Sequence, residues 1–218
     1  MSTDEPSTDR NRYQHLLDYL ASCSGESTGF IEHPDAAVNR MAMAQLATLR
    51  RAAVLIPITR NSATHESHVI LTVRSANLKS HAGQISLPGG SQDQRDDNAV
   101  ATALRESEEE IGLSRDHVEI IGQLGEMALP SGFRVTPVIG LIEPHLQFTP
   151  CPIEVADIFQ APLELVLNPS AYREGEVVIG EQSRKILELT FEDYRIWGAT
   201  ANILYHLALK VRGHANSL

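Results

Sequence analysis

Residues 89–113 read Gly-Gly-Ser-Gln-Asp-Gln-Arg-Asp-Asp-Asn-Ala-Val-Ala-Thr-Ala-Leu-Arg-Glu-Ser-Glu-Glu-Glu-Ile-Gly-Leu, and this stretch carries more information than any other part of the chain. Small and apolar residues recur at three- and four-residue spacing between Val100 and Ile111, which predicts an amphipathic helix. Short polar residues at positions 96–98 are candidate N-caps. Gly112 is expected to end the helix, because glycine adopts the left-handed conformation without a Cβ penalty.

Three carboxylates lie close together on this predicted helix. Glu106 and Glu110 are about 40° apart around the helix axis, and Glu109 lies about 60° to the other side of Glu106. Like charges at this spacing repel, and the helix dipole disfavours anions near the C-terminus. A divalent cation such as Mg²⁺ or Mn²⁺ would compensate both costs, because these ions prefer oxygen ligands. The alternative is a solvated acidic face, which explains most isolated charge runs.

The order of these residues resembles the signature of the Nudix hydrolases, G-x5-E-x7-R-E-U-x-E-E-x-G-U, where U is a bulky apolar residue. The second half matches without a gap, at Arg105, Glu106, Glu109, Glu110, Gly112 and Leu113. The first half departs, because fourteen residues rather than thirteen separate Gly90 from the arginine. The first acidic position holds Asp97, with Asp96 beside it, which leaves the role of this acid open. The resemblance implies an α/β fold, a Nudix-type α/β/α sandwich with a mixed β-sheet.

Residues 71–90 narrow the resemblance to the coenzyme A diphosphatase branch. They match its motif L-L-T-x-R-S-x3-R-x3-G-x3-F-P-G-G at Arg74, Ser75, Gly83 and Pro88 to Gly90. Lys79 and Leu87 replace an arginine and a phenylalanine of that motif. Residues 131–138 and 196–201 are similar to the same branch. The resemblance therefore implies metal-dependent cleavage of coenzyme A or its derivatives to 3′,5′-ADP and 4′-phosphopantetheine.

Two other functions stay open at this point. The first is a Nudix hydrolase of another nucleoside diphosphate derivative, such as ADP-ribose or NADH, or of a nucleoside triphosphate. The second is a non-catalytic module of the same fold that binds a nucleotide or a protein. A substrate panel with Mg²⁺ and Mn²⁺ separates the first from coenzyme A cleavage. The intact set of acids argues against the second, because a binding module does not need it.

The resemblance assigns catalytic roles to Arg105, Glu106 and Glu109, and metal binding to Glu106, Glu109 and Glu110. Glu109 either completes the metal cluster or accepts a proton from the attacking water. Arg105 is expected to orient one of these carboxylates, although an ordinary ion pair with Glu109 is the alternative. Glu154 is a weaker candidate for an additional acid.

Candidate substrate-binding residues are the cations Arg74, Lys79 and Arg134, together with the backbone of Gly89 and Gly90. The cations are expected to contact phosphates, and the alternative for each is a solvated side chain. Glycine at 89 and 90 lets the backbone approach a ligand closely. A lysine at position 79 keeps the charge of the usual arginine but not its planar, bidentate geometry.

Length, charge and composition exclude several classes of protein. The chain has 218 residues, which we divide into a polar segment over residues 1–35 with a possible short helix and a single Nudix domain over residues 36–218. The net charge of −10 argues against general nucleic-acid binding, and no apolar run of about 18 residues predicts a membrane span. The expected partner is therefore a small-molecule substrate, and relatives of the family suggest a homodimer. Two cysteines and a polar N-terminus favour a reducing, cytoplasmic setting.

Hydrophobic periodicity predicts mixed secondary structure. Strands are expected at residues 51–58 (ending near Pro57), 68–74, 118–124, 135–142 and 153–160, with a hairpin-like pair at 177–180 and 186–191. Further helices are expected at residues 15–23, 36–49, 162–167 and 196–211, beside the one that includes Val100 to Ile111 and ends at Gly112. Residues 75–90 form a long loop, and loops of that length are commonly functional.

Overall fold

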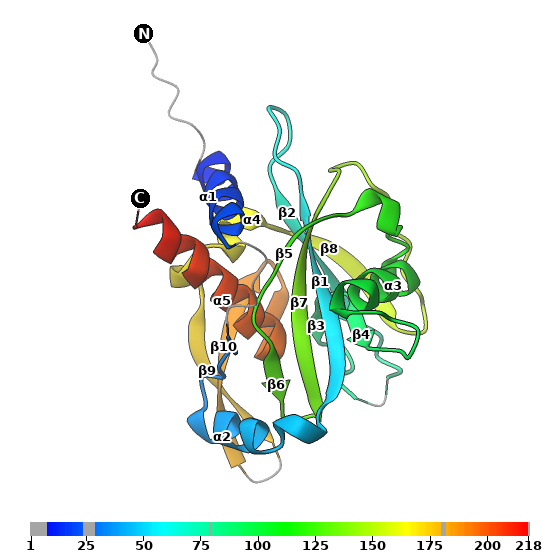
Figure 1. Ribbon diagram of the computed structural model, residues 1–218, viewed down its shortest axis with the longest axis vertical. Coiled ribbons are helices and arrows are strands. Elements are labelled where there is room, and N and C mark those ends of the chain that lie inside the picture. The colour runs from blue at the N-terminus through cyan, green and yellow to red at the C-terminus, as the bar shows by residue number, and fades with distance from the viewer. Residues whose placement is uncertain (1–7, 24–28, 79, 180–181, 218) are drawn as a thin grey trace.

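The computed structural model describes residues 8–23, 29–78, 80–179 and 182–217, and its centre is a mixed β-sheet with helices on both faces (Figure 1). The strands follow the order β3-β2-β1-β7-β5, with β4, β6 and β8 paired to β1, β7 and β2 respectively. β1 and β7 are parallel over their whole length, and the other pairings of this sheet are antiparallel. Its strands are β1 (Arg50–Thr59), β2 (His68–Arg74), β3 (Ile85–Ser86), β4 (Gly89–Ser91), β5 (Glu119–Gln123), β6 (Met127–Leu129), β7 (Phe133–Ile142) and β8 (Val155–Pro162).

A smaller antiparallel sheet, in the order β11-β10-β9, is formed by the C-terminal part of the chain. Its strands are β9 (Arg173–Ile179), β10 (Gln182–Phe191) and β11 (Tyr194–Trp197). The α-helices are α1 (Thr8–Ser22), α2 (Ala36–Ala44), α3 (Ala99–Ile111), α4 (Leu163–Val166) and α5 (Gly198–Ala215). Short 3-10 helices are η1 (Leu46–Thr48), η2 (Arg115–His117) and η3 (Pro169–Ala171).

The two faces of the large sheet pack against different partners. Along β1, Ala53 and Leu55 join a small apolar cluster with α3, whereas Ile56 and Ile58 join a larger cluster with α1, α4 and α5. Successive side chains of a strand point to opposite faces, so this alternation places β1 between the two layers. Burial of one large apolar side chain contributes about 1.5–3 kcal/mol to stability, so the apolar clusters on both faces stabilise the sheet. The predicted α/β architecture with a mixed sheet is confirmed.

Proline does not end the first long strand, which corrects one prediction. β2 has the predicted bounds, but β1 continues through Pro57 to Thr59 and pairs Pro57 with Gly140 of β7. Leu55, Ile56 and Ile58 are fully buried around it. Proline lacks only its own backbone N–H, and burial of these neighbours outweighs one lost ladder hydrogen bond.

The last helix begins later than predicted. Ile196 was expected to lie in this helix, but it belongs to β11 and pairs with Leu189 of β10. The helix predicted at 36–49 is also shorter, since α2 ends at Ala44 and only a 3-10 turn follows. A strand of four residues is too short for its period to be separated from that of an adjoining helix.

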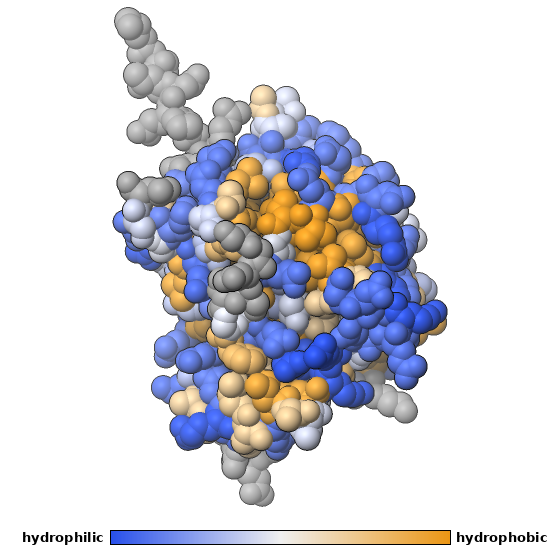
Figure 2. Space-filling model, in the orientation of Figure 1, coloured by the Kyte–Doolittle hydropathy of each residue, from blue (hydrophilic) through white to orange (hydrophobic). Residues whose placement is uncertain are grey.

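The predicted N-terminal segment contributes a helix to the core. Leu16 and Tyr19 of α1 are buried in the larger apolar cluster, next to α5. The boundary at residue 35 stays a prediction. Among the described helices, none has the length and hydrophobicity needed to cross a bilayer. Figure 2 shows hydrophobic residues at the surface over β5, where Val118, Ile120 and Ile121 are only partly buried.

Candidate functional site

Helix α3 begins and ends at well-defined caps. Asn98 is the N-cap, and its side-chain oxygen accepts a hydrogen bond from the N–H of Ala101 at 2.9 Å. Gly112 is the C-cap in the left-handed conformation, and its N–H donates to the carbonyl of Glu108. Asn98 is therefore the cap among the three polar candidates, and the helix has the predicted length.

Glu110 lies on the buried face of this helix. It shares that face with Ala103, Ser107 and Ile111, and its side chain is almost entirely shielded from solvent. The alternative of a solvated acidic face is therefore wrong for Glu110. Its position seven residues after Ala103 and three after Ser107 is the signal that could have shown the burial.

Few positive groups compensate the charge of Glu110. The N–H of Gly89 donates to its Oε2 at 3.0 Å, and Nη1 of Arg74 lies 3.9 Å from its Oε1. The pKa of Glu110 is raised to about 7, mainly by burial and less by the charges of Glu154 and Glu106, against the lowering effect of the Gly89 N–H and of Arg74. This carboxylate is thus under-neutralised at neutral pH.

The N–H of Gly89 reaches Glu110 because the backbone of Gly89 is paired closely with β1. It pairs with Val54 and has a φ of 154°, and a Cβ at this position would overlap the backbone of β1. Only glycine fits here.

Glu106 lies against Gly90. A Cβ on Gly90 would overlap the Glu106 carboxylate, so the absence of a side chain creates the space that this carboxylate fills. Nη1 of Arg105 lies 2.9 Å from Glu106 Oε1. Burial raises the pKa of Glu106, Arg105 lowers it, and the charges of Glu109 and Glu154 raise it again.

Arg105 is the centre of a hydrogen-bond network. Its Nε donates to Asp96 Oδ1 at 3.0 Å and its Nη2 to Asp96 Oδ2 at 2.8 Å, which is a bidentate pair. Nη2 also donates to the carbonyl of Ser91, and Nη1 donates to Glu109. The Arg105 guanidinium holds the pKa of Asp96 far below its usual range, and Asp96 in turn raises the pKa of Arg105. Arg105 is therefore fixed from four directions.

Asp96, and not Asp97, is the acid that pairs with Arg105. The side chain of Asp96 is buried, while Asp97 is exposed. The count back from Arg105 left both residues open, and the additional residue in this part of the box shifts the pairing to Asp96.

The three predicted metal ligands are not gathered into a finished cluster. In the part of the chain that the structure describes, no three Asp, Glu, His or Cys side chains form a ready metal site. Glu109 is exposed and pairs with Arg105 at 3.1 Å, which is the i,i+4 pair considered as an alternative. Arg105 also attracts Glu106, whereas Gly89 and Arg74 attract Glu110.

Glu154 belongs to the same electrostatic neighbourhood. It lies just before β8, and its carbonyl accepts a hydrogen bond from the N–H of Ser75 at 2.8 Å. Its charge raises the pKa values of both Glu106 and Glu110. The sequence alone could not show that Glu154 lies near Glu106 and Glu110, since Glu154 is 44 residues from Glu110 along the chain.

The predicted phosphate-binding cations have different surroundings. Arg74 ends β2 beside Glu110, as described above. Arg134 lies on β7, and its Nε is 3.2 Å from Glu126 Oε1, so its described ion pair is outside the carboxylate group. Lys79 lies outside the described residues.

The carboxylates fit a divalent cation. Glu106 and Glu110 offer oxygen atoms at a site where burial disfavours their charge, and an oxygen-rich, anionic site suits Mg²⁺ or Mn²⁺. A cation here would stabilise the ionised carboxylates, whose charge is disfavoured first by burial and then by neighbouring acids.

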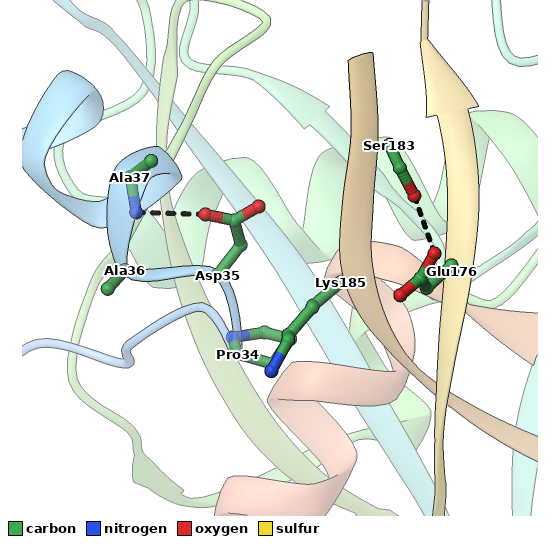
Figure 3. Close-up of a pocket in the computed structure, with 7 residues that line it drawn as sticks. All are labelled: Pro34, Asp35, Ala36, Ala37, Glu176, Ser183 and Lys185. Carbon is green, nitrogen blue, oxygen red and sulfur yellow. Dashed lines mark hydrogen bonds between the residues drawn. The ribbon is translucent and has the colours of Figure 1, made fainter.

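A hollow of about 410 Å³ lies elsewhere, between the start of α2 and the hairpin of β9 and β10 (Figure 3). Its polar groups are already paired, because Asp35 accepts from the N–H of Ala37 and Ser183 donates to Glu176. It is lined by Pro34, Asp35, Ala36, Ala37, Glu176, Ser183 and Lys185. We therefore assign the candidate site to the carboxylates and not to this hollow.

Comparison with known proteins identifies the family of this chain. A model of the NUDIX domain matches residues 49–168. The chain is 40% identical over 163 residues to the uncharacterized Nudix hydrolase NudL of Photorhabdus laumondii, which covers 75% of this chain and 86% of that protein. NudL of Escherichia coli strain K12 is 40% identical over 162 residues, with 74% and 83% covered. A crystal structure of a Nudix hydrolase from M. smegmatis, RenU, is 23% identical with a TM-score of 0.45, and covers 54% of this chain and 73% of that one. By the domain match and the identity to NudL, the chain belongs to the Nudix hydrolases, which act on diphosphate bonds of nucleoside derivatives.

Proposed function

We propose that this protein hydrolyses the diphosphate bond of coenzyme A or a close derivative, with Mg²⁺ or Mn²⁺, to give 3′,5′-ADP and 4′-phosphopantetheine. The observation that carries the hydrolytic part is the buried, under-neutralised Glu110 beside Glu106. Nudix hydrolases generally need divalent metal ions. The choice of coenzyme A rests on the motif of residues 71–90.

The carboxylates of α3 have separate tasks in this proposal. Glu106 and Glu110 are the metal ligands, since both are largely buried and both have raised pKa values. A bound divalent cation supplies neutralisation of the phosphate charge and a lower pKa for the attacking water. Glu109 is exposed at the rim, where it can serve as an outer ligand or accept a proton. Arg105 fixes the orientation of Glu106 through its bonds to Asp96 and Ser91.

The coenzyme A motif surrounds these carboxylates, which supports a joint role. Arg74 and Gly89 contact Glu110, and Gly90 lies against Glu106. Arg74 is placed to bind a phosphate of the substrate next to the metal ligands. Lys79 and Arg134 complete the proposed set of phosphate-binding cations, with the backbone of Gly89 and Gly90 close to the reacting group.

Product identification tests the proposal. Purified protein is incubated with coenzyme A, NADH, ADP-ribose and a nucleoside triphosphate, each with Mg²⁺, with Mn²⁺ and with EDTA, and the products are separated by mass. Metal-dependent formation of 3′,5′-ADP and 4′-phosphopantetheine as the fastest reaction is the expected result. Faster cleavage of NADH or ADP-ribose would contradict the coenzyme A assignment, and no cleavage of any substrate would favour a binding module.

A cytoplasmic setting and a homodimer are also part of the proposal. The two cysteines, Cys23 and Cys151, are free, which suits a reducing compartment. Light scattering at several protein concentrations measures the oligomeric state.

A further inference from the structure

Arg74 and Arg105 both contact the predicted metal-binding carboxylates of α3, and they are held very differently. Arg105 makes a bidentate pair with Asp96 and further bonds to Ser91 and Glu109, and its side chain is 17% exposed. Arg74 has one charged partner, Glu110, at 3.9 Å, which is beyond hydrogen-bond range, and its side chain is 28% exposed. Arg105 cannot move without the loss of several bonds, whereas Arg74 can.

The inner part of the Arg74 side chain has an unmet bonding requirement. Its Nε is shielded from solvent and has no hydrogen-bond acceptor among the described residues. A buried guanidinium N–H without an acceptor is costly, so a phosphate or carboxylate oxygen in reach of it would be bound favourably. The guanidinium is thus a donor group whose capacity is only partly used.

The backbone of Arg74 is fixed although its side chain is not. Its N–H donates to the carbonyl of Gln84 at 2.9 Å, and its carbonyl accepts from Gly83 at 3.1 Å. The pairing of β2 with β8 also shifts register between Val73 and Arg74, and such bulges re-aim a side chain. A fixed backbone with a long, loosely held side chain can direct the guanidinium either to Glu110 or away from it.

We infer that Arg74 stands in for the divalent cation at Glu110 in the metal-free protein and turns to a phosphate of the substrate when the cation is present. This inference rests on the proposed function. Arg74 then has two partners, one after the other: Glu110 first and a phosphate of the substrate afterwards. In the metal-free protein it neutralises part of the Glu110 charge, and it competes with the cation for the same carboxylate. Once released, it adds a positive charge and five N–H donors to the place where the diphosphate binds.

This role predicts opposite effects on two ligands when Arg74 is replaced. In R74Q the competitor at Glu110 is absent, so Mn²⁺ is expected to bind roughly three- to tenfold more tightly. A diphosphate is expected to bind roughly tenfold more weakly to the Mn²⁺-loaded protein, because one charged contact is lost. Replacement of a residue with a merely structural role would lower the affinity for both Mn²⁺ and the diphosphate.

The experiment measures both affinities by calorimetry at one pH and one ionic strength. Mn²⁺ is titrated into the metal-free protein, and methylenediphosphonate, a diphosphate that cannot be hydrolysed, is titrated into the protein saturated with Mn²⁺. The matched control is R115Q, because Arg115 also faces a glutamate of α3, Glu108, at 3.7 Å, but both side chains are largely exposed. R115Q is expected to leave both affinities within about twofold of the wild type.

R74K keeps the proposal testable if R74Q does not fold, which circular dichroism would show. Lysine keeps the charge but not the planar fork, so Mn²⁺ affinity is expected to stay within about twofold of the wild type while methylenediphosphonate binds more weakly. Unchanged or weakened Mn²⁺ binding in R74Q, or an altered Mn²⁺ affinity in R74K, would overturn the inference. E110Q separates this result from failure of the proposed function. If E110Q binds Mn²⁺ as the wild type does, the proposed metal site is wrong and the inference fails with it.

Discussion

Asp96 and Glu110 are two buried carboxylates beside the same helix, with side chains 5% and 4% exposed, and their pKa values are shifted in opposite directions. Asp96 accepts hydrogen bonds from Arg105, from the hydroxyl of Thr102 and from the N–H of Asp93. Glu110 accepts one hydrogen bond, from Gly89, and has Arg74 at 3.9 Å. Both side chains are shielded from solvent, but the hydrogen bonds from Arg105 are the largest influence on the pKa of Asp96, whereas burial is the largest influence on that of Glu110.

The difference separates the part of the site whose charges are paired from the part whose negative charge is only partly compensated. The Asp96–Arg105 network satisfies its own charges and fixes the geometry of the box. The Glu106–Glu110 pair carries unbalanced negative charge, because Glu154 and Glu109 add to it. A structure can keep such a pair only at a cost in stability, and this cost is typical of functional sites.

The largest expected effect comes from Glu110→Gln, which removes the charge that we assign to metal binding. We expect kcat to fall about 1,000-fold, which corresponds to about 4 kcal/mol in the activation barrier. Replacement of a residue that only supports a metal ligand already lowers activity about 10- to 100-fold, and replacement of the ligand itself should lower it more. The matched control is Glu108→Gln, an exposed residue of the same helix, which should keep wild-type kcat. Steady-state rates at saturating Mn²⁺ measure both. Equal rates for wild type and Glu110→Gln would place the chemistry elsewhere.

Asp96→Asn tests the complete half of the comparison. Arg105 would lose its bidentate partner while it stays largely buried, and breaking a buried pair in this way costs about 3–4 kcal/mol of unfolding free energy. Urea unfolding in EDTA measures the loss. Asp97→Asn is the control, since Asp97 is exposed and should change the value by less than about 0.5 kcal/mol. A larger effect at Asp97 than at Asp96 would reverse our assignment of the first acid.

The pH dependence of stability tests whether the charge of Glu110 is only partly compensated. The pKa of Glu110 is about 7 in the folded protein, above its ordinary value of 4.5, so the folded state keeps a proton that the unfolded state has released between these values. The metal-free protein therefore loses stability as the pH rises from about 4.5 to 7, by on the order of 2–3 kcal/mol, and this loss is complete above pH 7.

Glu110→Gln isolates this contribution. Urea unfolding in EDTA between pH 5 and pH 8 is compared for the two proteins, and the wild type should lose more stability than the variant across the window. The variant is then the more stable protein at pH 8 although it is inactive. Parallel stability curves for the two proteins would show that Glu110 carries no unbalanced charge. Mn²⁺ should reduce the difference at pH 8, because it compensates the ionised carboxylate.

Much of the fold follows from local pattern in the sequence. β2 has the predicted bounds because its flanks are polar and its interior is apolar. The length of α3 follows from Asn98 and Gly112. The end of β1 and the start of α5 were predicted wrongly. Pairing with the distant strand β7 carries β1 past Pro57, and hairpin pairing with β10 places Ile196 in a strand in spite of a short helical pattern.

The candidate site divides in the same way. Arg105, Glu106 and Glu110 are recognisable because they lie within six consecutive residues of one helix. The neighbourhood of Glu154 and Arg74 depends on the pairing of β2 with β8, and that pairing is not encoded near either residue. The burial of Glu110 depends on what covers the helix face. The balance of charge between the two halves of the site is therefore a property of the tertiary structure.

Gly90→Ala gives the smallest expected effect and tests how closely the two halves are coupled. The added Cβ would overlap the Glu106 carboxylate, which must move away from Arg105 or push β4 from β1. We expect kcat to fall about tenfold, since a displacement of roughly 1 Å at a catalytic group costs 10–100-fold. Gly213→Ala is the control, because a Cβ there meets no other atom and the residue lies near the end of α5. If both variants keep full activity, Glu106 does not need its place against Gly90, and the metal site would have to rest on Glu110 with other partners.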